Sequence, residues 1–193
     1  MGTAIASKSC FHEVLDSVLH RSTEELFGRA GVARAVASSD ASRQVDDLHV
    51  GAMITFDGPR IRGALMLICT FGVAARTRPA KLGAAAQLSG STARDWILIR
   101  DWTGELANQL AGRMKNRLHS FGITFQIAPP VALSGRGLAL ALQKPHGSQT
   151  LAFGSGDGCV RVLIDLAAEP QLASPAPRPG VEESAREGDV IEF

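Results

Sequence analysis

Two polar side chains on one helix are the residues of this chain best arranged to do chemistry. Glu105 and Asn108 stand three positions apart in a segment whose apolar residues repeat with helical spacing. Residues three apart on a helix are surface neighbours. A carboxamide both donates and accepts hydrogen bonds, whereas a carboxylate accepts them and carries charge. An isolated pair of this kind is ordinary solvated surface in most helices, so its surroundings decide its meaning.

A single polar stripe surrounds this pair on a helical wheel drawn at about 100° per residue. The polar stripe consists of Asp101, Glu105, Asn108 and Gly112, and Gln109 and Asn116 lie beside it. A glycine inside an exposed helix costs about 1 kcal/mol relative to alanine, yet Gly104 and Gly112 both adjoin the polar stripe. The missing side chains permit another backbone to come close. This face therefore predicts a docking surface for a protein that supplies its own reactive group.

The opposite side of the same helix is apolar and faces a core. It carries Trp102, Leu106, Ala107, Leu110, Met114 and Leu118. Arg113 and Arg117 project toward the edge of this apolar side, where their stems either cover the core or reach a second subunit. Asp101 has an alternative role as the N-cap of a helix that begins there.

Several kinds of site have no support in the sequence. The three cysteines and five histidines are scattered without metal-ligand spacing, so no metal site is predicted and the thiols are expected to be reduced and partly buried. No phosphate-binding GxxxxGK[ST] loop is present, and the glycines of 154–158 fit a hairpin turn better. A net charge of +1 without charge blocks favours neither nucleic acid nor a membrane surface. Apolar runs are too short to span a bilayer, which predicts a cytoplasmic protein.

The first half of the chain predicts a helix followed by a hairpin. Apolar residues at helical spacing indicate an amphipathic helix at about 10–29, although Ser22 with Glu25 could cap a second helix inside it. A polar connection comes next. Strict alternation from Leu48, the turn Asp57-Gly58-Pro59 and an apolar run to Phe71 then predict two paired strands. The region 72–90 supports at most a short or broken helix, because Pro79 and Gly83 interrupt it.

The second half predicts one long helix and further strands. The helix begins at about Ala93 or Asp101 and ends at His119, and Gly122 closes it. Strands are predicted at four places: 123–127, 138–143, 149–153 and 159–166. Residues 169–193 lack apolar periodicity and predict a flexible tail, whose six acidic and two basic residues give it −4 and leave the rest of the chain at about +5.

The predicted fold is α+β, with one domain over residues 1–168 and the tail at 169–193. An antiparallel sheet of about six strands is covered on one face by two long helices, the first and the third. This arrangement leaves the polar stripe in solvent.

The stripe also carries a family resemblance. From Asp101 to Gly112 the sequence has D-x3-E-x2-N-x3-G spacing and resembles the signature helix of the CheX, CheC and FliY phosphatases of bacterial chemotaxis. The sequence beyond Gly112 resembles the CheX branch, in which the helix leads into a strand, a proline-containing segment like 128–131 and a turn like Ser134-Gly135-Arg136.

The resemblance covers most of residues 10–167, because the opening helix and the hairpin at 50–68 match the family's order. Two segments depart from the family's pattern. The region 72–91 lacks the family's regular helix, and the acidic tail is extra. Only one E-x2-N pair is present, unlike the two-site CheC pattern.

The resemblance implies hydrolysis of the aspartyl phosphate of a CheY-like response-regulator receiver domain. Asn108 would orient the attacking water, and Glu105 would pair with a lysine of the receiver. Further partner-binding residues would be Asp101, Gly104, Gln109 and Gly112. The chain would bind no cofactor of its own, since Mg2+ would be the receiver's ligand. CheX-type relatives also imply a homodimer.

Two other classes of function compete with this hydrolase. The first is an adaptor that holds a receiver or another signalling partner through the same helix face without turnover, with the tail as a second tether. Intact Glu105 and Asn108 favour the enzyme, whereas the altered middle segment and added tail favour the adaptor. The second is a purely structural component like those of the flagellar switch. This hypothesis has less support, because such proteins need not keep Glu105 and Asn108.

Overall fold

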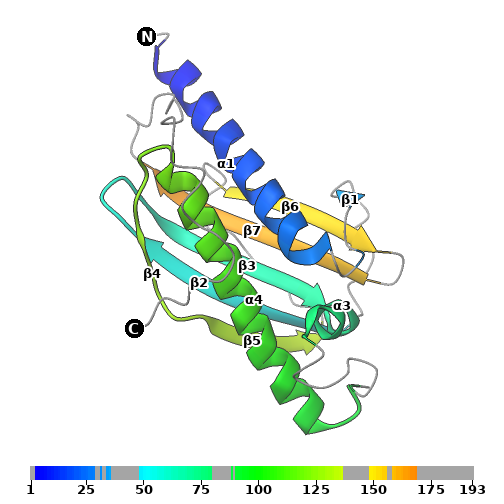
Figure 1. Cartoon of the computed structure of the whole chain (residues 1–193). Coiled ribbons are helices and arrows are strands. Elements are labelled where there is room, and N and C mark those ends of the chain that lie inside the picture. The colour runs from blue at the N-terminus through cyan, green and yellow to red at the C-terminus, as the bar shows by residue number, and fades with distance from the viewer. Residues whose placement is uncertain are drawn as a thin grey trace.

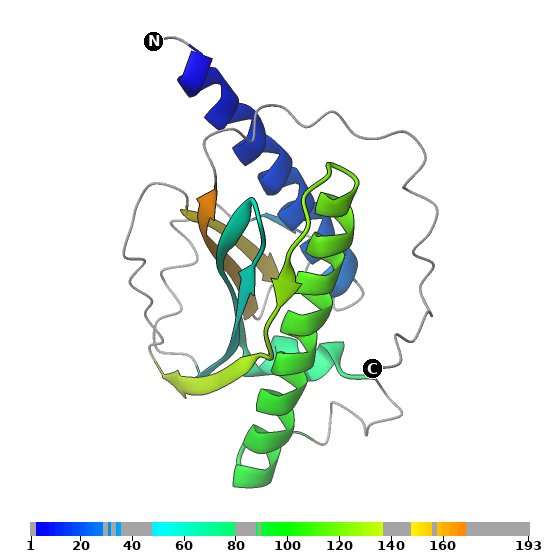
Figure 2. The same ribbon diagram turned by 90° about the vertical axis from the view of Figure 1, so that its left-hand side faces the viewer.

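The chain folds into two layers, an antiparallel sheet and a pair of long helices on one of its faces. The computed structural model describes residues 3–28, 31, 34–35, 48–79, 88, 90–136, 148–155 and 158–168. Helices α1 (Thr3–Phe27) and α4 (Ala93–His119) lie across the same face of the sheet (Figures 1 and 2). The short helix α3 (Phe71–Thr77) lies at one end of this layer. The α+β class and the two covering helices are therefore confirmed.

Within the described residues the sheet has seven strands, of which two are only two residues long. Its order is β1-β6-β7-β3-β2-β4, and β5 also pairs with β2. The strands are β1 (Arg34–Ala35), β2 (Leu48–Asp57), β3 (Ile61–Thr70), β4 (Gln126–Ile127), β5 (Val131–Arg136), β6 (Ser148–Ser155) and β7 (Gly158–Ala168). Every pairing is antiparallel. The predicted hairpins β2–β3 and β6–β7 are both present.

Period-two patterning decides which face of each strand meets the helices. In β2, alternate residues from Val50 to Phe56 are buried in the core, whereas Thr55 and Asp57 are exposed on the other face. The register pairs β2 with β3 over nine residues, from His49–Thr70 to Asp57–Arg62. A slip by one residue would turn the apolar set of β2 away from the helices, so the pattern fixes the register.

The two long helices fill the core layer with their apolar sides. α1 buries Phe11, Leu15, Val18 and Leu19 among others and runs without interruption to Phe27. Ser22 is buried within it, so the alternative of a second helix restarting at Ser22 is wrong. The helix also begins earlier than the predicted residue 10, at Thr3. The short helix expected within 72–90 is present as α3.

α4 begins and ends with sequence-encoded caps. The Thr92 hydroxyl accepts a hydrogen bond from the Asp95 backbone N–H at 3.1 Å. At the other end Gly122 adopts a left-handed conformation with φ 73°, and its N–H donates to the His119 carbonyl at 2.8 Å. The earlier of the two predicted starts is therefore correct, and α4 spans 27 residues.

Two predictions after α4 need correction. The strand expected over 123–127 is shorter, Gln126–Ile127, because the Ile123 N–H donates to the Leu118 carbonyl at the end of α4 at 3.1 Å and not to another strand. Phe125 packs on Phe56, with ring centroids 5.1 Å apart. The turn expected at 134–136 is instead part of strand β5, whose pairing with β2 overrides the turn propensity of Ser-Gly.

Other sequence predictions fall outside the described residues. The strand at 138–143 and the tail at 169–193 lie there, so the domain limits 1–168 and 169–193 stay predictions. Within the described part of the chain, no helix is long and apolar enough to cross a membrane.

Candidate functional site

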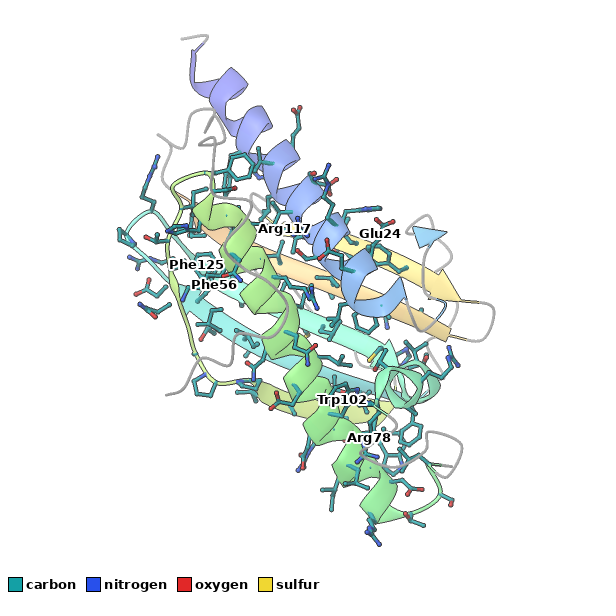
Figure 3. The ribbon with its side chains drawn as sticks, in the orientation of Figure 1. Glu24, Phe56, Arg78, Trp102, Arg117 and Phe125 are labelled. Atoms are coloured by element: carbon teal, nitrogen blue, oxygen red, sulfur yellow. The ribbon has the colours of Figure 1, made fainter. Side chains whose placement is uncertain are left out.

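The apolar side of α4 holds this helix firmly against the sheet. Leu106, Ala107, Leu110, Met114 and Leu118 are all buried, as the helical wheel predicts. Trp102 is half-buried and points toward α3 (Figure 3), where its indole N–H donates to the Thr77 hydroxyl at 2.9 Å. With its core side so fixed, α4 presents its opposite face outward in a defined orientation.

A second tryptophan anchors the first turns of α4. The indole N–H of Trp96 donates to the Gly90 carbonyl at 2.8 Å, and its ring lies 4.8 Å from that of Phe71 in α3. Gly90 has φ 71°, a conformation that side-chain-bearing residues rarely adopt. The two indoles thus tie α4 to α3 and to the segment that precedes α4. Sequence reasoning did not identify Thr77 and Gly90 as supports, because neither contact follows from local periodicity.

The polar stripe lies on the outward face of α4. Asp101, Glu105 and Gln109 are exposed, and Asn108 is half-buried. Glu105 and Asn108 are three residues apart on a continuous helix, which places their Cβ atoms about 5–6 Å from each other. The predicted side-by-side arrangement of carboxylate and carboxamide is therefore present on the outward face of this helix.

Asp101 lies well inside α4 and is not its N-cap. The cap is Thr92, two turns earlier, so the alternative role for Asp101 is wrong. Its carboxylate lies 3.2 Å from the Arg100 guanidinium, with both side chains largely in solvent. An exposed pair of this type adds little stability. Asp101 is therefore placed where it can contact a partner without any structural duty to the helix.

The two glycines beside the polar stripe have different surroundings. Gly104 is buried, and a Cβ built there would lie 3.6 Å from Cγ of Pro130, which precedes β5. The expectation that Gly104 leaves an open notch is wrong, because the chain's own proline covers it. Gly112 is half-buried, and a Cβ there would meet nothing within 4 Å. Only Gly112 leaves the open space that a partner's backbone could use.

Arg113 and Arg117 are held by α1. Arg113 Nη1 lies 3.4 Å from Glu25 Oε2, and Arg117 Nη2 contacts Glu25 Oε1. Figure 3 shows Arg117 on the side of α4 that faces α1. The sequence left open whether these two arginines cover the core or reach a second subunit. Their contacts with Glu25 show that both side chains extend toward α1 of the same chain. The two guanidiniums and one carboxylate link the helices at the edge of the core.

The described residues contain no set of three or more His, Cys, Asp or Glu side chains placed to hold a metal ion. Cys69 and Cys159 are free and buried. Burial raises the pKa of the Cys69 thiol to about 12, which keeps it protonated and poorly nucleophilic near neutral pH. The outward face of α4 offers a carboxylate at Glu105 and a carboxamide at Asn108 for hydrogen bonding and charge.

Comparison with known proteins identifies the family of this fold. The family model described as chemotaxis phosphatase CheX matches residues 50–154, more than half of the chain and including all of α4. The chain belongs to the CheX family. A search of curated proteins finds no match.

Solved structures of the CheX and CheC groups share the fold. A CheX protein from Vibrio vulnificus superposes with a TM-score of 0.60 at 20% identity, covering 80% of this chain and 97% of the other. A CheC-like superfamily protein from Shewanella sp. PV-4 gives 0.57 at 18% identity, covering 87% and 100%. The CheX–CheY–BeF3–Mg2+ complex from Borrelia burgdorferi gives 0.52 at 13% identity, covering 80% and 96%. This CheX family member therefore has the complete family fold with a strongly diverged sequence.

Proposed function

We propose that this CheX family member hydrolyses the aspartyl phosphate of a CheY-like receiver domain, using Glu105 and Asn108 on α4. The observation that carries the proposal is the placement of these two side chains. They lie side by side on the outward face of a helix whose other side is locked in the core, inside the region that matches the chemotaxis phosphatase family. The structure of a CheX–CheY–BeF3–Mg2+ complex from Borrelia burgdorferi supports a receiver domain as the partner.

Asn108 is the residue proposed to position the attacking water. In the hydrolysis, the water oxygen bonds to phosphorus, the bond from phosphorus to the receiver's aspartyl oxygen breaks, and the carboxylate leaves. The products are an unmodified aspartate and inorganic phosphate, which takes up both protons of the water and releases one of them according to pH. A carboxamide accepts from the water and donates to a phosphoryl oxygen at once, and it brings no negative charge toward the phosphate. Placing the water in line supplies much of the acceleration.

Glu105 is proposed to fix the register of the two proteins. Glu105 is an exposed carboxylate beside Asn108, and we expect it to pair with a lysine of the receiver. An exposed ion pair contributes little affinity in water, but one that is covered as two proteins dock gains in strength and specifies their orientation. Asp101, Gln109 and Gly112 are proposed to line the same contact. Mg2+ would be held by the receiver, and the CheX–CheY–BeF3–Mg2+ complex from Borrelia burgdorferi contains this ion.

The test is release of phosphate from a phosphorylated receiver, with an asparagine control from the same helix. We expect Asn108→Ala to lose about a hundredfold or more in turnover while binding of the receiver is largely kept. Asn116 is exposed on α4 two turns further on, so Asn116→Ala makes the same chemical change away from the pair. Its turnover is expected to match the wild type. Equal rates for the Asn108 and Asn116 variants would reject the proposed role of Asn108.

Glu105→Ala is expected to weaken both receiver binding and turnover. The adaptor alternative predicts a different pattern, in which the wild-type chain binds activated receivers and leaves the lifetime of their phosphate unchanged. That result across the organism's receivers would reject catalysis. The homodimer and the cytoplasmic location stay predictions, the first to be measured by light scattering of the purified protein and the second by fractionation of cells.

A further inference from the structure

We propose that Lys115 is a phosphoryl-sensing residue, whose ammonium group contacts the phosphoryl oxygens of the docked receiver. The inference rests on the proposed function and extends it to a residue outside the D-x3-E-x2-N-x3-G spacing. In this proposal the ammonium group of Lys115 interacts with the negative charge of the phosphoryl group on the receiver.

Lys115 stands on the Asn108 side of the polar stripe. The two residues are seven positions apart on one continuous helix, so they lie within about 20° of each other on the wheel and about 10 Å apart along the axis. Side chains on a helix lean toward its N-terminus, so the Lys115 stem leads back toward Asn108. The turn that it crosses carries Ala111 and Gly112, and a Cβ at Gly112 would meet nothing within 4 Å. No bulky side chain of that turn obstructs the ammonium's path toward Asn108.

The other cations on this part of α4 are already engaged. Arg113 and Arg117 both contact Glu25 of α1, and Arg100 contacts Asp101. Lys115 is half-buried and forms no ion pair within the described residues, so its charge is available to a partner. Lysine keeps a mobile point charge on a four-carbon stem, which suits contact with a phosphoryl group.

The electrostatics of docking favour a further cation beside the Mg2+ of the receiver. The outward face of α4 brings the carboxylates of Asp101 and Glu105 toward a partner that carries a phosphoryl group with negative charge. Arg100 neutralises part of the charge of Asp101. In the proposed function, Glu105 pairs with a lysine of the receiver. A lysine that is paired with Glu105 contributes less positive charge to the phosphoryl oxygens, where charge shifts during hydrolysis. Lys115 adds positive charge there from the other side of Asn108.

The first test compares binding of two forms of one receiver. Affinity is measured by titration calorimetry for the unmodified receiver and for the receiver carrying BeF3− with Mg2+. We expect Lys115→Gln to weaken binding of the BeF3− form by about tenfold, between the limits that Coulomb's law gives for such charges in water and near a protein surface. Binding of the unmodified form is expected to change less than twofold, and Lys115→Arg is expected to restore the difference.

Arg94 provides a matched control. It is exposed on the same arc of α4, two turns before Asp101, and it too carries one positive charge. Arg94→Gln changes net charge equally but lies about 20 Å along the axis from Asn108. The inference is overturned if Arg94→Gln weakens binding of the BeF3− form as much as Lys115→Gln does. It is also overturned if Lys115→Gln weakens both receiver forms equally, which would indicate a general contact.

The second test separates this inference from the proposed function. In the phosphate-release assay, Lys115→Gln is expected to lower turnover at saturating receiver by about tenfold, and addition of salt is expected to narrow the gap. A wild-type chain that releases no phosphate rejects the proposed function, while the binding comparison still decides the role of Lys115. An active wild type with an equally active Lys115→Gln rejects the phosphoryl contact alone.

Discussion

Replacement of Gly112 by alanine is expected to change the stability of the protein and its affinity for the receiver in opposite directions. Gly112 lies in the interior of α4, and its φ is not in the left-handed region. A Cβ there would meet nothing within 4 Å, so the methyl group adds no internal clash. Glycine is about 1 kcal/mol less favourable than alanine inside a helix. Gly112→Ala is therefore expected to raise the free energy of unfolding by about 1 kcal/mol, or the Tm by roughly 2–4 °C for a chain of this size.

The same methyl group is expected to weaken the receiver complex. If the partner's backbone uses the open space at Gly112, the added methyl overpacks the contact at a cost of about 1–3 kcal/mol. Receiver affinity then falls by roughly tenfold, since about 1.4 kcal/mol corresponds to a factor of ten. The opposite signs of the two effects matter, because a loss of activity in a more stable protein does not arise from unfolding.

Circular dichroism melting and calorimetric titration with the BeF3−-carrying receiver measure the two effects. Gly104→Ala is the matched control on the same helix. Its Cβ would lie in ordinary van der Waals contact with Pro130 and be hidden from a partner, so we expect a similar gain in Tm and an affinity within twofold of the wild type. A Gly112→Ala protein that melts higher and binds as well as the wild type would refute the close-approach reasoning. A lower Tm would refute the propensity argument.

Three further predictions concern the packing that supports α4. Trp102→Phe removes the indole N–H that donates to Thr77 and is expected to cost about 1 kcal/mol in urea unfolding. Glu25→Gln removes the charge that two arginines of α4 share; in these half-exposed pairs the expected loss is below about 1 kcal/mol and disappears in about 1 M salt. Cys69 is expected to resist Ellman's reagent at about pH 8 in the folded protein. In the unfolded chain the Cys69 thiol ionises around its ordinary pKa of 9.0, whereas in the folded protein its pKa is about 12. The free energy of unfolding is therefore expected to fall as the pH rises from about 9 to about 12, and to fall less in Cys69→Ala.

The polar stripe was predictable from sequence because it depends only on the period of one helix. The caps at Thr92 and Gly122 and the buried face from Leu106 to Leu118 follow the same local rules, and so does the β2–β3 hairpin. The family resemblance came from the same helix, and the match over residues 50–154 confirms it.

The features that the sequence did not reveal depend on contacts between distant segments. Gly104 is covered by Pro130, which lies beyond the end of α4 and reaches it only because β5 pairs with β2. Local turn propensity at Ser134-Gly135 gave no sign of that strand. Arg113 contacts Glu25, which lies 88 positions away in the sequence. Helical periodicity could place the Arg113 side chain at the edge of the apolar side of α4, but it could not identify Glu25 as the partner.

The convex placement of Glu105 and Asn108 has a kinetic consequence for signalling. Both side chains lie on the outward surface of a single helix, so the proposed site is completed only while a receiver is docked. Each turnover then needs a fresh bimolecular encounter. When the chain is scarce relative to its dissociation constant, the lifetime of the phosphorylated receiver varies inversely with the number of chains in the cell. Expression level would then set the duration of the signal.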